Sequence, residues 1–212
     1  MQLGRTCSFT KPRGRQRGMG ATIILFTIAL LVLVGAALAY ATRSNLQSIT
    51  IQGAKTQSGV VLKQSADYRD AYTRFIFDGG VASTMTFNVV GPTVLDLFYP
   101  ASQYGSYSPP PAQIMTNAAT PQWLYNKSVI VTGVGSVAAD SIAYIPDVLQ
   151  VVCTQINNQM YASPAIPVSS VVALTNLATN GITLDATVSG RSSGCFQTTD
   201  TKYVIYTTLG EA

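Results

Sequence analysis

The longest apolar run of the chain covers residues 21–41, where no charged residue occurs. Only Thr22, Thr27 and Gly35 fall outside the apolar set. At about 1.5 Å of rise per residue, a helix of this length spans roughly 30 Å, which is the thickness of the hydrocarbon core of a bilayer. The pattern therefore predicts a transmembrane helix over residues 21–41.

Positive charges precede this span and are scarce after it. Lys11, Arg13, Arg15 and Arg17 lie on its N-terminal side, whereas Arg43 is the cation that follows it closely. Because cytoplasmic flanks carry the excess of Lys and Arg, we expect a single membrane pass with the N-terminus in the cytoplasm. The C-terminal part is then expected to be exported.

Apolar residues continue at helical spacing after the membrane span. They are Leu46, Ile49, Val61, Tyr68, Tyr72 and Phe75. No proline occurs between Pro12 and Pro92, and Asp78-Gly79-Gly80 is a helix stop, so one long helix is predicted over residues 19–80. Gly53 and Gly59 predict a kink or short break over residues 52–59. A membrane anchor followed by a coiled-coil stalk is the alternative, although no sustained heptad repeat is present.

Residues 81–212 have the features of one β-rich domain. Strands are predicted over residues 84–90, 93–98, 124–134, 182–188 and 202–209, which are rich in β-branched and aromatic side chains. An irregular surface loop is predicted over residues 99–122, where Tyr104 and Tyr107 either contact a partner or are simply exposed. A helix is predicted over residues 146–160, with Pro146 and Asp147 in its first turn. The fold class is therefore α+β.

A short basic leader ending in glycine precedes the apolar run and reads Arg-Gln-Arg-Gly-Met at residues 15–19. It resembles the class III signal of type IV pilins and pseudopilins, which prepilin peptidase cleaves before the hydrophobic segment. The resemblance implies a leader over residues 1–18, cleavage between Gly18 and Met19, a helix over 19–80 and an extracytoplasmic domain over 81–212. Cleavage after Gly20, an uncleaved signal anchor, or a conventional signal peptide cut near residues 37–39 are the competing interpretations.

Ile23 departs from the family pattern. Most members carry Glu at mature position five, where its carboxylate neutralises the N-terminal amine of a neighbouring subunit. Burying an unpaired charge costs several kcal/mol, so a subunit without this Glu is poorly suited to receive a neighbour's amine at every step of a long fibre. The chain therefore resembles the minor pilins and minor pseudopilins, some of which lack this Glu and lie at or near the filament tip.

The resemblance also implies a fold and partners. The long helix would pack on an antiparallel C-terminal sheet, and the partners would be other pilin or pseudopilin subunits, prepilin peptidase and inner-membrane lipid. Whether the filament is a pilus, a secretion pseudopilus or a DNA-uptake apparatus stays open. The alternative function is a membrane-anchored periplasmic binding or adhesion domain that does not assemble.

Charge and cysteine content fit an exported domain. The net charge of +4 becomes −1 without the leader, whose five charges are all positive, so the exported part gives no support for nucleic-acid binding. Cys7 lies in the leader, which leaves Cys153 and Cys195 in the mature chain. We predict that these two pair in an oxidising compartment, with two unrelated buried thiols as the alternative.

Catalytic chemistry has few candidate residues. The chain has no His, which excludes Ser-His and Cys-His mechanisms, and no Gly-x-Ser-x-Gly or phosphate-binding Gly-x-x-x-x-Gly-Lys motif. Asp140 and Asp147 could form an acid/base pair, but loop and helix-start positions explain them better. Asp185 and Asp200 lie in no calcium-binding motif. We predict no enzymatic activity, no metal and no cofactor.

Overall fold

The computed structural model describes residues 51–87, 96–99, 104–117, 121–179, 181–184 and 186–210, together with positions 29 and 32. Its contacts divide the chain into two units, Met1–Ile49 and Thr50–Ala212. The leader and, except for Ala29 and Val32, the predicted span 21–41 lie outside the described residues. Among the residues that are described, no helix is long and apolar enough to cross a membrane.

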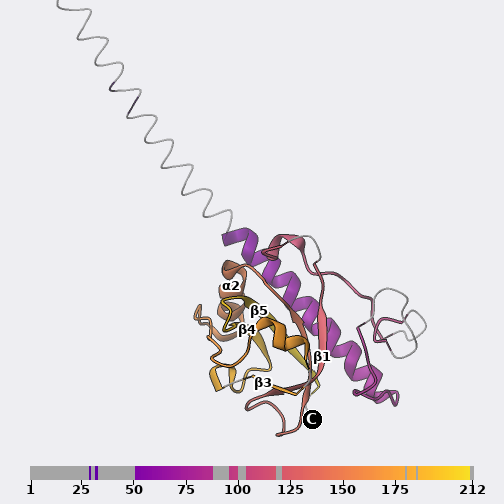
Figure 1. Ribbon diagram of the computed structural model, residues 1–212. Coiled ribbons are helices and arrows are strands. Elements are labelled where there is room, and N and C mark those ends of the chain that lie inside the picture. The colour runs from indigo at the N-terminus through magenta and orange to yellow at the C-terminus, as the bar shows by residue number, and fades with distance from the viewer. Residues whose placement is uncertain are drawn as a thin grey trace, which may run out of the picture. The chain divides into compact units, whose positions relative to one another are not determined.

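The second unit is α+β, with a five-stranded sheet in the order β3-β1-β2-β5-β4, a helix over residues 51–77 and a shorter helix α2 (Figure 1). The strands are β1 (Leu124–Val131), β2 (Asp140–Ile145), β3 (Ile182–Leu184), β4 (Ser193–Gln197) and β5 (Tyr203–Gly210). Helix α2 is Gln150–Tyr161, and 3-10 helices cover Ala112–Ile114 (η1), Leu174–Ala178 (η2) and Ala186–Val188 (η3).

The sheet is mixed, so the prediction of an antiparallel sheet is wrong at one edge. Three strand pairs are antiparallel, but β3 runs parallel to β1, with Val129 opposite Ile182. Parallel neighbours need a long crossover, and here the chain passes through β2, α2 and η2 before it returns. The Asn126 amide of β1 donates hydrogen bonds to the carbonyls of Leu177 (2.8 Å) and Thr179 (2.6 Å), which hold the returning chain beside β1.

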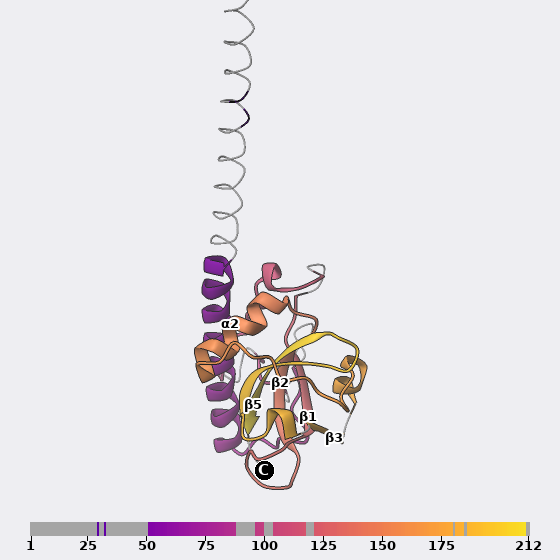
Figure 2. The same cartoon turned by 90° about the vertical axis from the view of Figure 1, so that its left-hand side faces the viewer.

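The helix of residues 51–77 packs along the sheet with one face (Figures 1 and 2). Val61, Tyr68 and Ala71 on that face are at most 2% exposed. The helix continues through residues 52–59 without the predicted break. Gly53 and Gly59 are exposed, with no atom within 4 Å of an added Cβ, while burial of the opposite face stabilises the helix against their entropic cost. The same helix therefore shares one compact unit with the sheet.

The predicted stop at residues 78–80 ends this helix. Gly79 adopts a left-handed φ of 89°, and the Gly80 N–H donates to the Phe75 carbonyl at 2.9 Å. These bonds satisfy helix carbonyls that would otherwise lack partners.

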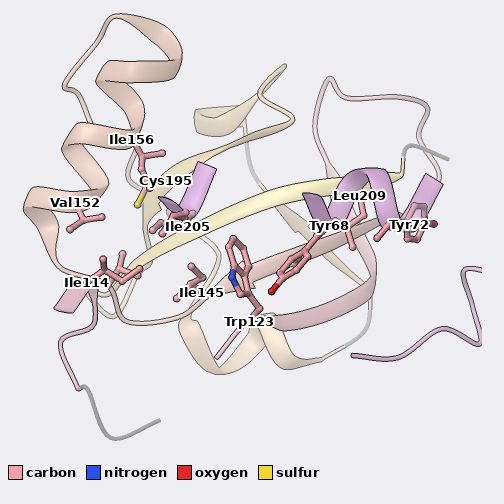
Figure 3. Close-up of a cluster of buried hydrophobic side chains, with 14 of the residues drawn as sticks. Tyr68, Tyr72, Ile114, Trp123, Ile145, Val152, Ile156, Cys195, Ile205 and Leu209 are labelled. Atoms are coloured by element: carbon pink, nitrogen blue, oxygen red, sulfur yellow. The ribbon is translucent and has the colours of Figure 1, made fainter. Parts of the chain in front are cut away.

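Apolar side chains cover both faces of the sheet. Alternate residues of β2 point to opposite sides, so that Ala143 and Ile145 join one cluster and Ile142 and Tyr144 join the other. The first cluster lies against the 51–77 helix and α2, and Figure 3 shows its central side chains. The second is covered by η2 and η3 through Leu177 and Val188. All six residues of β2 are consequently buried.

Helix α2 begins later than predicted. Pro146 and Asp147 precede it, and Asp147 has a positive φ of 52°. Val148 N–H donates to the Tyr203 carbonyl and Leu149 N–H to the Ile114 carbonyl, so these residues are held by neighbouring segments and not by the helix. The helix therefore begins at Gln150.

The strands predicted between residues 84 and 98 are not formed where the structure describes them. Thr86 and Asp96 make an isolated parallel bridge, and the intervening residues 88–95 lie outside the description. In the segment predicted as a strand over 182–188, β3 ends at Leu184 and a 3-10 turn covers Ala186–Val188.

Candidate functional site

The two cysteines of the predicted mature chain meet between α2 and the edge strand β4. Cys153 and Cys195 form a disulfide with their Cα atoms 5.3 Å apart and a sequence separation of 42. Both are buried, at 0% and 2% exposure. Asn157, one helical turn on, donates to the Cys195 carbonyl (2.8 Å) and accepts from its N–H (2.9 Å). The covalent link and these bonds together fix α2 to β4.

The outer edge of β4 is closed along its length. Beyond the two bonds to Cys195, the Ser193 carbonyl accepts from the Tyr161 hydroxyl, and Gln197 exchanges bonds of 2.8 Å with Pro167 and Ser169. A sheet edge recruits an added strand only when its backbone groups are unpaired. Growth of the sheet by strand addition is therefore blocked at β4.

The tyrosines of the predicted surface loop pack inward. Tyr107 stacks on Tyr68 of the helix at 6.3 Å between ring centroids, and Tyr104 meets Phe75 edge-on at 5.5 Å. The Trp123 N–H donates to the Tyr107 hydroxyl at 3.0 Å, and burial raises the pKa of Tyr68 far above its usual range. These contacts hold residues 104–117 against the helix, so Tyr104 and Tyr107 are not simply exposed at the tip of a loop.

The two aspartates considered as an acid/base pair lie too far apart. Asp140 starts β2, whose extended chain to Ile145 is about 16 Å long at roughly 3.3 Å per residue, and Asp147 lies two residues beyond that end. Glycosidase carboxylates lie at most about 9.5 Å apart. Asp140 is fully buried and accepts the Val131 N–H at 3.1 Å, while Asp147 pairs with Lys202 at 3.2 Å. Both carboxylates are structural.

A groove of about 580 Å³ opens where the 51–77 helix ends beside the last residues of β5. Its walls include Tyr72, Phe77 and Leu209, and Lys127 is the charged side chain that lines it. Phe77 is 89% exposed. These residues come from the helix, β1 and β5, which are distant in sequence, so no local pattern could have identified them.

A chain of hydroxyl groups begins at two lining residues of this groove, Tyr72 and Ser141. Ser141 Oγ lies 3.3 Å from the Tyr72 hydroxyl and 3.0 Å from the Tyr125 hydroxyl, which in turn donates to the Ala82 carbonyl at 3.2 Å. Burial raises the pKa of Tyr125 to about 12. The groove thus combines apolar walls with hydroxyl groups and the Lys127 cation.

The predicted cleavage junction, Gly18 and Met19, lies outside the described residues. Within the described ranges, no group of three or more His, Cys, Asp or Glu side chains could hold a metal ion. Comparison of the chain with protein-family models, curated proteins and solved structures finds no match. The pilin resemblance therefore rests on the N-terminal sequence alone.

Proposed function

We propose that the chain is a minor pilin or pseudopilin, a structural subunit that joins a filament through its apolar N-terminal segment. In this proposal prepilin peptidase removes residues 1–18, and residues 21–41 hold the subunit in the inner membrane until it assembles. Assembly exchanges lipid for contacts with similar helices, and small residues such as Gly20, Ala29 and Gly35 allow close approach. No step requires catalysis.

The observation that carries the proposal is the packing of the 51–77 helix. Residues 51–77 are helical, and the inner face of this helix, with Val61 and Ala71, is buried against the sheet of the same unit. An exported subunit needs a folded domain of this kind, and a helix packed on a sheet supplies it.

The outer face of the same helix carries charged side chains beside a few exposed apolar ones such as Val60 and Phe77. Lys55, Lys63, Asp67 and Asp70 are exposed on it, and Lys63 pairs with Asp67 at 2.7 Å. A face of this kind stays soluble before assembly, which supports an exported subunit that waits in the membrane as a monomer.

Processing of variants at the leader junction tests the proposal. Gly18→Val places a branched side chain at the cleavage position, so cells that express prepilin peptidase should accumulate the full-length precursor. Gly14→Val is the matched control, because it changes another leader glycine flanked by arginines and should be processed normally. Gly20→Val distinguishes the alternative junction. Normal processing of both Gly18→Val and Gly20→Val would contradict the pilin assignment.

The groove favours a second candidate function, a tethered binding or adhesion domain that never assembles. Its apolar wall and the exposed Phe77 would accept a ligand, with Lys127 at the rim. This function predicts an unprocessed, membrane-retained chain that is absent from filament preparations. The leader variants therefore separate the two candidates.

A further inference from the structure

Two arginines converge where the 51–77 helix meets the ends of α2 and β4. The Arg69 Nε donates to the Thr208 carbonyl at 3.0 Å, and its Nη2 lies 3.3 Å from the Ser193 hydroxyl. The Arg191 guanidinium lies over the Tyr161 ring, with its central carbon 4.5 Å from the ring centroid. Arg69 thus contacts Ser193, and Arg191 lies over Tyr161, whose hydroxyl donates to the carbonyl of the same Ser193.

No described carboxylate neutralises these cations. The ion pairs among the described residues join Lys63 to Asp67 and Lys202 to Asp147, so neither arginine has a described carboxylate oxygen within 4.0 Å. The acceptors of Arg69 are neutral hydroxyl and carbonyl groups. Within the described part of the chain the two cations therefore have no counter-charge, and an anion would be attracted to them.

The Arg191 guanidinium is positioned but not engaged. No hydrogen bond joins it to a described residue, and its contact there is with the Tyr161 ring. The Tyr161 hydroxyl in turn donates to the Ser193 carbonyl. Because a guanidinium presents its donors as a rigid planar fork, Arg191 keeps donors that suit a bidentate oxyanion.

Both arginine charges affect the pKa of Tyr161. Burial raises the pKa of Tyr161, while the Arg191 charge, the hydrogen bond to Ser193 and the Arg69 charge oppose that rise. Both arginines are neither fully buried nor fully exposed. They are therefore accessible to a solute, yet partly withdrawn from water, which strengthens their attraction for an anion.

We propose that Arg69 and Arg191 form a binding site for a phosphate group. Two cations at one site suit a group that carries more than one negative charge, and a phosphate monoester carries about −1.5 to −2 at pH 7. Arg191 supplies the bidentate fork, and Arg69 supplies the second charge from the helix. The phosphate is either free or carried as an ester on a larger molecule. This site goes beyond filament assembly and does not depend on it.

Phosphate titration of the purified full-length chain in detergent tests the site. Thermal unfolding is followed by the fluorescence of Trp123, the one Trp of the chain, which is buried. Sodium phosphate should raise the melting temperature saturably, beyond sodium chloride of the same ionic strength. Arg191→Gln should weaken phosphate binding at least tenfold. Without phosphate its melting temperature should fall only slightly, because the guanidinium contacts the Tyr161 ring but makes no hydrogen bond to a described residue.

Matched variants separate a specific site from general charge. Arg74→Gln removes an exposed cation from the same helix and should leave the phosphate response unchanged. Arg191→Lys keeps the charge but loses the planar fork, so it should bind more weakly than wild type and more tightly than Arg191→Gln. Tighter binding of glycerol 3-phosphate than of inorganic phosphate would identify an ester as the ligand, and the reverse would identify the free ion. Equal effects of phosphate and chloride, an unchanged response in Arg191→Gln, or an equal loss in Arg74→Gln would overturn the proposal.

Discussion

Replacing Cys153 and Cys195 together by alanine removes the one covalent link between α2 and β4 without leaving a free thiol. The bridge closes a loop with a sequence separation of 42. Loop-closure entropy for that length corresponds to a stabilisation of about 4 kcal/mol. A typical domain has a net stability of ~5–15 kcal/mol, so this change is a large share of the whole.

The double variant should lower the free energy of unfolding by about that amount and the melting temperature by roughly 10 °C. Trp123 fluorescence during urea or thermal unfolding is the assay, because its indole Nε1 donates to Gln64 inside the core and reports on this unit alone. Cys7→Ala is the control and should leave the stability unchanged. A loss below about 1 kcal/mol, or reactive thiols at both positions in the denatured, unreduced protein, would refute the reasoning.

Three further predictions follow from particular contacts. Gly53→Ala should stabilise the unit by up to about 1 kcal/mol, because an added Cβ meets nothing within 4 Å. Gly210→Ala should destabilise it, because the added Cβ would overlap the Tyr72 ring. Chemical denaturation measures both effects. Burial raises the pKa of Tyr125 to about 12, which favours the folded state below pH 10 and loses that effect as pH rises through 12, so the free energy of unfolding should fall across that window. The chain should enter filaments without a carboxylate at position 23, and Ile23→Glu should be tolerated poorly or neutrally, as quantification of the subunit in sheared fractions would show.

The sequence predicted the elements whose signals are local. The 51–77 helix carries a long apolar stripe and ends at the Gly79-Gly80 stop, and β5 covers nearly the residues that its β-branched and aromatic run indicated. The pairing of Cys153 with Cys195 was predicted from their number and expected compartment, and the structure places them within bonding distance.

Other elements depend on contacts that a local pattern does not contain. Strand β2 was missed because both of its faces are buried, which removes the alternation that identifies a strand. Strand β4 was missed because it is short and contains Gly194, whose close neighbours Asn157 and Tyr161 come from α2. The parallel pairing of β3 depends on where Asn126 holds the returning chain.

The candidate sites were less predictable than the fold. Lys127 of the groove comes from β1 and Phe77 from the helix, and Arg69 and Arg191 are more than a hundred residues apart. None of these residues lies in a motif, since tertiary packing alone brings them together. The leader junction is the opposite case, because its signal lies wholly in the sequence around Gly18.

The most direct test of the central proposal is N-terminal sequencing of the protein recovered from a sheared surface-filament fraction. The account predicts that the protein is present there as a minor component and begins at Met19, with Gly20, Ala21, Thr22 and Ile23 following. Recovery from the membrane fraction alone, with residues 1–18 still attached, would contradict it.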